Sequence, residues 1–263
     1  MNHETIIILD FGSQYTQLIA RRVREQGVYC EIHPFHLSAE AINARRPKGV
    51  ILSGGPSSVT DADAPRVAAD FYDRIDVPIL GICYGMQLVA VDLGGTSEPA
   101  ARREYGAATL KVLSGKTALF NELPFELDVW MSHGDHVTRL PGGFTTTATT
   151  GDVITAIENE ARSIYCVQFH PEVSHTPLGK EILRNFVFNI CGCKGDWTPA
   201  QFIKEEIERI RETVGPTGNV VCGLSGGVDS TVAAVLVHEA ICERQTCIFV
   251  NSGLLRAGEF EDT

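Results

Sequence analysis

The sequence has no long apolar run. None of its uninterrupted hydrophobic stretches approaches the roughly 20 residues that a membrane-spanning helix needs. The N-terminus, MNHETIIILD, has four consecutive apolar residues before an aspartate, so we expect no signal peptide. These features favour a cytoplasmic location and exclude a membrane partner.

Basic residues are also scarce. Lys and Arg number 22 against 33 Asp and Glu, which gives a net charge of −11. A nucleic-acid-binding surface needs a basic patch or stripe, so we expect no nucleic-acid partner. The 44% of hydrophobic residues and 21% of charged residues are typical of globular proteins, and 263 residues allow one large or two ordinary domains.

The eight cysteines lack the paired spacing of a zinc ribbon. Cys191 and Cys193 form the only close pair, and no second pair accompanies them. Most cysteines lie in apolar segments, where a free thiol behaves as a small hydrophobic group. We therefore expect no metal site here. Internal repeats and low-complexity segments are absent as well.

Short apolar runs alternate with helical patterns in the first half of the chain. Residues 5–10, 48–55 and 77–82 predict buried strands, and residues 13–27 and 65–75 predict helices. This order predicts a doubly wound α/β sheet with right-handed crossovers and functional loops at the carboxyl ends of its strands. The β-rich, hairpin-like region that follows makes the expected sheet mixed, and a last helix closes this unit at residues 178–190.

The pattern breaks at CGCKGDWTP, near residue 195. Thr198 can cap a new helix, and Pro199 fits its first turn. Apolar residues recur at helical spacing over 202–214. We therefore predict two domains, at residues 1–195 and 196–263.

The segment PILGICYGMQLVA, residues 78–90, carries the strongest chemical signal. A buried strand leads through Gly81, Cys83 and Gly85 into a helical pattern, as in a nucleophile elbow with Cys in place of Ser. The glycines allow close backbone approach at a strained turn, and the helix N-terminus favours the thiolate. A buried structural cysteine between two glycines is the alternative.

A second segment, YCVQFHPEVSHT, supplies a partner for this cysteine. We predict a strand that ends in His170-Pro171-Glu172, where residues i and i+2 point the same way. Glu172 can then accept from one imidazole nitrogen while the other nitrogen faces Cys83. The expected result is a Cys-His-Glu triad.

Two further loops are expected to provide polar groups. LSGGPSSV follows a strand, and the amides of Gly54 and Gly55, with the N–H of Tyr84, could form an oxyanion hole. MSHGDHV, residues 131–137, is predicted to be a polar loop. His133 and His136 resemble a metal pair, but no carboxylate cluster accompanies them, so we favour substrate binding.

The motifs GICYGMQ, LSGGP, SHGD and FHPE together resemble the class I glutamine amidotransferases over residues 1 to about 193. The resemblance implies that Cys83 attacks the glutamine amide, His170 shuttles protons and Glu172 orients His170. Glutamate and ammonia would be the products. The glutamine-binding residues implied in this way are Gln87, Ser132, His133, Gly134 and Asp135.

In the second domain, NVVCGLSGGVDSTVAAVLVHEA predicts a strand, a glycine-rich turn and a helix. Such a turn lets backbone N–H groups approach phosphate oxygens at a helix N-terminus. G-K-[ST] is missing, so this is not a Walker loop. It resembles the pyrophosphate loop of ATP pyrophosphatases; a plain glycine-rich turn is the alternative. The candidate ATP-binding residues are Ser225, Gly226, Gly227, Val228, Asp229, Ser230 and Thr231, with Asp229 near Mg²⁺.

The order of the two domains resembles the family of glutamine-hydrolysing GMP synthetases. That resemblance implies ATP and Mg²⁺ as cosubstrates without a prosthetic group, adenylylation of XMP, and displacement of AMP by ammonia to give GMP. Asn251 stands where many relatives carry Asp, which removes a charge from the expected nucleotide contact.

We expect the second domain to be incomplete, so that this chain alone is only a glutaminase. The XMP site would lie outside it, on a missing C-terminal portion or a separate synthetase chain, in an enzyme that is a homodimer at full length. An amidotransferase subunit of another synthase should lack SGGVDS, and a non-catalytic module should have lost part of the triad. A tRNA-modifying pyrophosphatase is disfavoured by the acidic charge balance.

Overall fold

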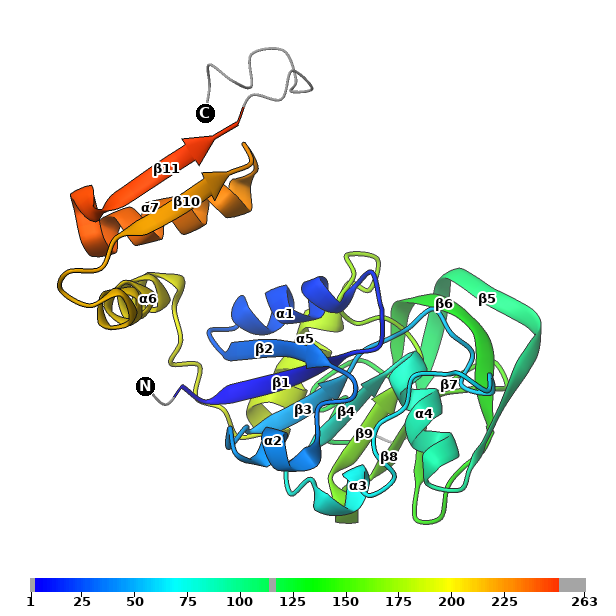
Figure 1. Cartoon of the computed structure of the whole chain (residues 1–263). Coiled ribbons are helices and arrows are strands. Elements are labelled where there is room, and N and C mark those ends of the chain that lie inside the picture. Colours follow the sequence, from blue (N-terminus) through cyan, green and yellow to red (C-terminus); the bar gives the residue numbers. More distant parts are fainter. Residues whose placement is uncertain (1–2, 114–116, 251–263) are drawn as a thin grey trace. The chain divides into compact units, whose positions relative to one another are not determined.

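A computed structural model describes residues 3–113 and 117–250 of the chain (Figure 1). The chain divides into two compact units, Met1–Trp197 and Thr198–Thr263, and each is described by itself. Asn251, singled out in the sequence, lies outside the described residues. No helix in the described ranges has the length and apolar character needed to cross a membrane.

The first unit is built on one nine-stranded mixed sheet with the order β2-β1-β3-β4-β9-β8-β7-β5-β6. Its parallel half consists of β1 (Thr5–Asp10), β2 (Tyr29–Pro34), β3 (Gly49–Leu52), β4 (Ile79–Ile82) and β9 (Ile164–Val167). The antiparallel half consists of β5 (Thr96–Val112), β6 (Glu126–Arg139), β7 (Thr145–Thr150) and β8 (Val153–Asn159). The predicted doubly wound mixed α/β fold is confirmed.

Helices cover both faces of the parallel half. They are α1 (Thr16–Arg24), α2 (Ala39–Asn43), α3 (Phe71–Arg74), α4 (Tyr84–Asp92) and α5 (Gly179–Arg184), with the π-helix η2 (Asn185–Ile190) continuing α5 and the 3-10 turn η1 (Glu160–Arg162) preceding β9. Side chains alternate along β1 because successive strand residues point to opposite faces. Ile6 and Ile8 enter one buried cluster, and Ile7 and Leu9 enter the other.

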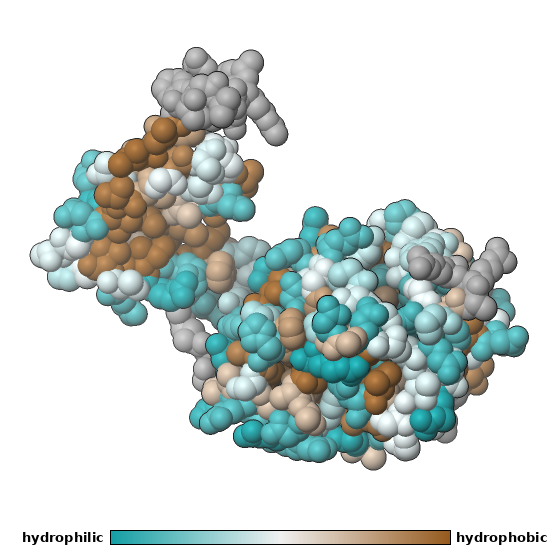
Figure 2. Space-filling view, turned by 45° about the vertical axis from the view of Figure 1, so that its right-hand side comes forward, coloured by the Kyte–Doolittle hydropathy of each residue, from teal (hydrophilic) through white to brown (hydrophobic). Residues whose placement is uncertain are grey.

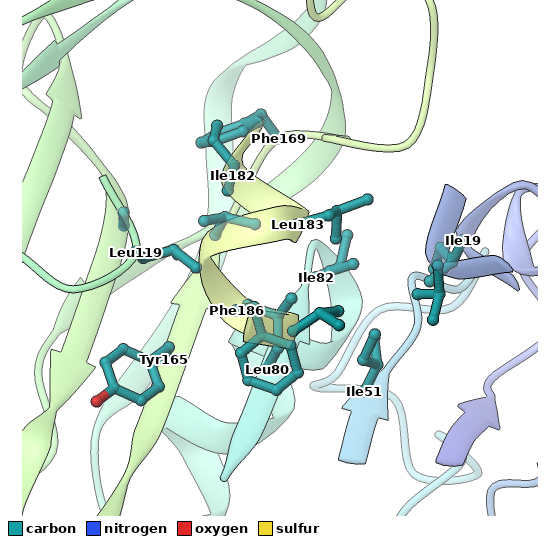
Figure 3. Close-up of a cluster of buried hydrophobic side chains, with 14 of the residues drawn as sticks. Ile19, Ile51, Leu80, Ile82, Leu119, Tyr165, Phe169, Ile182, Leu183 and Phe186 are labelled. Atoms are coloured by element: carbon teal, nitrogen blue, oxygen red, sulfur yellow. The ribbon is translucent and has the colours of Figure 1, made fainter. Parts of the chain in front are cut away.

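The first cluster lies under α1, α5 and η2. Leu183 and Phe186 project from the helical segment toward Ile82 and Leu80 of β4, and Ile182 lies beside Phe169 (Figure 3). The second cluster gathers residues of α2, α3 and α4 on the other face. Full burial of a side chain of this size contributes about 1.5–3 kcal/mol, so the two clusters fix the strand ends on which the polar loops depend.

Two predicted elements differ from the structure. The helix expected over residues 65–75 is confined to α3. The Pro65 carbonyl, which would accept an intrahelical bond in the longer helix, instead accepts from the Tyr84 hydroxyl. The predicted polar loop MSHGDHV is instead part of β6, where it pairs with β5 across a register irregularity between Pro99 and Glu104.

The second unit contains α6 (Pro199–Val214), β10 (Val220–Leu224), α7 (Val228–Ile241), η3 (Cys242–Arg244) and β11 (Gln245–Phe249). β10 and β11 form a parallel pair. As predicted, Thr198 caps α6 by accepting from the Gln201 N–H, and Pro199 opens the helix. Figure 2 shows apolar areas on the surface of this unit. Its large exposed apolar side chains are Ile203, Val221, Val228, Val232, Val235, Ile248 and Val250.

Candidate active site

Cys83 occupies the sharp turn between β4 and α4. Its backbone has φ 53° and ψ −104°, in a region that a residue with a Cβ atom rarely adopts. The flanking glycines are required by close packing: a Cβ on Gly81 would lie 2.8 Å from the Gly85 carbonyl, and a Cβ on Gly85 would lie 2.5 Å from the Leu52 carbonyl oxygen. The turn therefore has the geometry of a nucleophile elbow.

His170 and Glu172 follow β9 rather than ending it. The strand stops at Val167, and the backbone turns at residues 171–173, so the juxtaposition does not come from the extended geometry expected from the sequence. His170 Nδ1 nevertheless lies 2.7 Å from Glu172 Oε1, and Glu172 is fully buried. Arg22 Nε holds this turn by donating to the Glu172 carbonyl at 3.0 Å.

The His170 main chain and ring are both fixed. Its N–H donates to the Trp130 carbonyl at 3.1 Å, and its carbonyl accepts from the Thr176 hydroxyl at 2.7 Å. The Tyr15 ring packs edge-on against the imidazole, with centroids 5.1 Å apart. The imidazole is thus held in one orientation, with Nδ1 on Glu172.

The charge of His170 is set by competing effects. Burial alone would lower its pKa, but hydrogen bonds to Cys83 and Glu172, together with the charges of these groups, raise the pKa of His170 to about 10. These contacts favour the protonated form of the ring. An imidazolium beside a cysteine sulfur can protonate a leaving group.

These groups open into a cavity of about 580 Å³. Cys83 and His170 line it, and so do most of the residues predicted from the sequence: Gly55, Tyr84, Gln87, Ser132, His133, Gly134 and Asp135. Gly54 lies directly behind this lining, since a Cβ there would be 3.2 Å from His170 Cε1 and 3.7 Å from Cys83 Cβ. The structure thus brings the predicted amidotransferase residues together, from the carboxyl ends of β3, β4 and β9 and from residues 132–135 of β6.

The Asp135 region is organised by buried side chains. The Asp135 carbonyl accepts from Gln87 Nε2 at 2.8 Å and lies 3.0 Å from His133 Nδ1, and its carboxylate accepts from the Ser58 hydroxyl. His133 is 3% exposed, and its Nε2 lies 3.2 Å from Glu104 Oε2. Burial lowers the pKa of His133, and the nearby Glu104 carboxylate opposes this effect. His133 therefore helps to hold the Asp135 side of the cavity in place.

Sequence reasoning missed three parts of the site, one of which is Tyr105 of β5, which also lines the cavity. The loop after β1 contributes four consecutive residues, from Gly12 to Tyr15, to the cavity. Its place at the carboxyl end of a parallel strand was a usable signal, because ligand sites of such sheets form there. Gln168 was also missed. It is fully buried, and its Nε2 lies 3.7 Å from Cys83 Sγ.

The glycine-rich turn of the second unit has the features of a phosphate loop. Gly226 adopts φ +78°, which favours glycine, and Gly227 is the N-cap of α7 without a side-chain cap. The Ser225 and Ser230 hydroxyls lie 3.0 Å apart and fix the loop. The first N–H groups of a helix have no intrahelical acceptor, so those of α7 could bind an anion. Asp229 is exposed in its first turn and could approach a phosphate-bound cation.

The fold and the arrangement at Cys83 agree with a match to a family model: residues 7–190 match glutamine amidotransferase class-I. The chain belongs to this family. Residues 200–255 match the NAD synthase family model.

Among curated proteins, the chain is 55% identical over 260 residues to proteins named GMP synthase [glutamine-hydrolyzing] from Bacillus cereus (strain AH820) and Bacillus anthracis. The matched segment covers 98% of this chain and 50% of each relative, so the chain spans about half the length of these proteins.

Two solved structures are similar to this chain. A protein from Thermoplasma acidophilum, described as a GMP synthase subunit, has a TM-score of 0.66 and 32% identity, covering 80% of this chain and 99% of that one. A glutamine amidotransferase from Thermotoga maritima has a TM-score of 0.59 and 17% identity, covering 73% of this chain and 100% of that one. At that identity the second structure supports the fold alone.

Proposed function

We propose that this chain hydrolyses glutamine to glutamate and ammonia, with Cys83 as nucleophile, His170 as general acid and base, and Glu172 as the group that orients His170. The observation that carries the proposal is the placement of Cys83 and His170 in one cavity, with His170 Nδ1 2.7 Å from the buried Glu172 carboxylate. The domain that does this corresponds to residues 1–195 of the sequence.

The reaction proceeds in two steps. Cys83 Sγ attacks the carboxamide carbon of glutamine, and the oxyanion that forms is stabilised by the Tyr84 N–H and the Gly54–Gly55 amides. His170 gives its proton to the leaving nitrogen, so ammonia departs and a glutamyl thioester remains. His170 then takes a proton from water, the resulting hydroxide attacks the thioester, and glutamate leaves as Cys83 is regenerated.

The free hydrogen-bonding capacity of the cavity suits an amino acid. Both Nε2 hydrogens of Gln87 are engaged, one by the Asp135 carbonyl and one by Gln168 Oε1 at 3.3 Å. Its Oε1 is then the part of the side chain that can meet the substrate. Asp135, with Ser132 and Gly134 beside it, supplies acceptors for the α-ammonium group, which carries a positive charge.

We propose further that the ammonia is used to make GMP. The supporting observations are the names of the relatives at 55% identity and the phosphate-loop geometry at Ser225–Ser230. In this reaction ATP adenylylates XMP with release of pyrophosphate, and ammonia displaces AMP to give GMP. The XMP site and the remaining nucleotide contacts would lie on a further portion or a separate synthetase chain, in an enzyme that is a homodimer. Asp229 would lie near the Mg²⁺ that accompanies the ATP phosphates.

Glutamate release by the purified chain tests the glutaminase proposal. Cys83→Ala should abolish it and His170→Ala should lower it by orders of magnitude, whereas Glu172→Gln should retain more activity than His170→Ala because the ring can still sample its productive tautomer. Cys222→Ala, in the second unit, is the matched control and should keep full activity. A Cys83→Ala variant that still releases glutamate would overturn the assignment, and a lower activity in Glu172→Gln than in His170→Ala would reverse the two roles.

A further inference from the structure

The sulfur of Cys83 lies between an acceptor and a donor. Cys83 Sγ is 3.7 Å from the Ser132 carbonyl oxygen and 3.7 Å from Gln168 Nε2. The carbonyl can accept from the thiol, but it repels a thiolate. An N–H donor has the opposite effect, because a hydrogen bond to a charged acceptor is stronger than one to a neutral acceptor. The two contacts therefore favour different charge states of the same atom.

The orientation of the Gln168 amide follows from its neighbours. The Asp135 carbonyl can only accept, so the group that Gln87 turns toward it at 2.8 Å must be its NH₂ group. The second hydrogen of that NH₂ group reaches Gln168 Oε1 at 3.3 Å. With its oxygen facing Gln87, Gln168 must direct its own NH₂ group toward the sulfur.

We propose that Gln168 is a positioning residue that donates a hydrogen bond to the Cys83 sulfur and connects the nucleophile to Gln87 in the glutamine pocket. This inference rests on the glutaminase function proposed above. Gln168 is fully buried, and its main-chain N–H is fixed to the Thr155 carbonyl at 2.8 Å, so the amide has little freedom to turn away. Its N–H offsets the repulsion that the Ser132 carbonyl exerts on the thiolate.

Two variants separate this role from simple packing. Gln168→Glu keeps an oxygen acceptor for Gln87 but puts a carboxylate oxygen in place of the donor at the sulfur. Gln168→Met keeps the volume and removes both polar groups. The matched control is Thr155→Val, since the Thr155 hydroxyl is buried without a hydrogen-bond partner among the described residues, and its carbonyl still accepts from Gln168.

The experiment measures glutamine hydrolysis and the pH dependence of Cys83 alkylation by iodoacetamide. Loss of a hydrogen bond to a charged group predicts a kcat about ten- to a hundredfold lower in Gln168→Glu, with KM changed much less because the contact to Gln87 is kept. The midpoint of the alkylation profile should move to higher pH in both variants and stay in place in Thr155→Val. Circular dichroism of each variant checks folding.

An alkylation profile that coincides with that of the unmodified chain in a folded Gln168→Glu protein would overturn the role of Gln168. Glutamine hydrolysis that is absent in the unmodified chain would instead contradict the proposed function, and the alkylation profile would still decide the role of Gln168. Equal losses of kcat in Thr155→Val and Gln168→Glu would show a packing effect and would also overturn the proposal.

Discussion

The backbone strain at Cys83 predicts an unusual order of stability between two variants. Glycine is ordinarily less favourable than alanine by about 0.5–1 kcal/mol, because it loses more conformational freedom on folding. At φ 53° and ψ −104° a Cβ atom is unfavourable, whereas glycine accepts such a conformation readily. Cys83→Gly should therefore be more stable than Cys83→Ala.

The magnitude follows from the two opposing effects. A residue held in a sparsely populated backbone region costs about 1–3 kcal/mol, and the flexibility of glycine in the unfolded chain costs about 0.5–1 kcal/mol. The difference leaves Cys83→Gly more stable by about 1 kcal/mol, with an upper bound of about 2.5 kcal/mol. Both variants lose the same buried sulfur, so the loss of its packing cancels in the comparison.

Urea unfolding followed by tryptophan fluorescence measures this difference. Both tryptophans, Trp130 and Trp197, belong to the first unit, so the signal reports the unit that contains Cys83. An alanine variant that is as stable as the glycine variant, or more stable, would refute the claim that the elbow stores strain.

Two further predictions follow from close packing and from burial of charge. Gly85→Ala should destabilise the first unit by about 2 kcal/mol or more, as at other overpacked sites, because its Cβ would meet a backbone carbonyl at 2.5 Å. Gly142→Ala, the control, has open space around the added Cβ and should be neutral or stabilising in the same unfolding assay. Equal effects of the two substitutions would contradict the packing argument. Burial raises the pKa of Glu158 from 4.5 to about 7, so its contribution to stability is fully present below pH 4.5 and is lost as the pH rises through about 7. Glu158→Gln should then be more stable than the unmodified chain by about 1–3 kcal/mol at about pH 8, and the two should be similarly stable at about pH 4. A stability difference that does not change with pH would show that burial of the charged Glu158 carboxylate does not destabilise the fold.

Much of the parallel half of the fold was predictable because its strands are continuous apolar runs. Residues 5–10 could be assigned to a buried strand, and the helix after Thr198 could be placed from its cap and its proline. The segment at residues 131–137 was harder to assign. Leu127, Val129, Met131 and His133 occupy successive buried positions of β6, but the last of these is polar and hides the alternation.

The site was predictable only where function requires a characteristic local motif. The elbow around Cys83 and the His170-Pro171-Glu172 turn have such motifs, although the turn after β9 was mistaken for extended strand. Gln168 has none, because its importance arises from contacts to Cys83 and Gln87, on separate parts of the chain. Contacts of this kind depend on strand order and register, which local sequence does not specify.

Covalent labelling tests the central claim most directly. A diazoketone analogue of glutamine should enter the cavity, react with the nucleophile and leave a stable adduct that peptide mass spectrometry can locate. The account predicts a single label on Cys83, protection by excess glutamine, and much slower labelling in His170→Ala. Label on Cys30, Cys166 or Cys222, or labelling that glutamine does not slow, would contradict it.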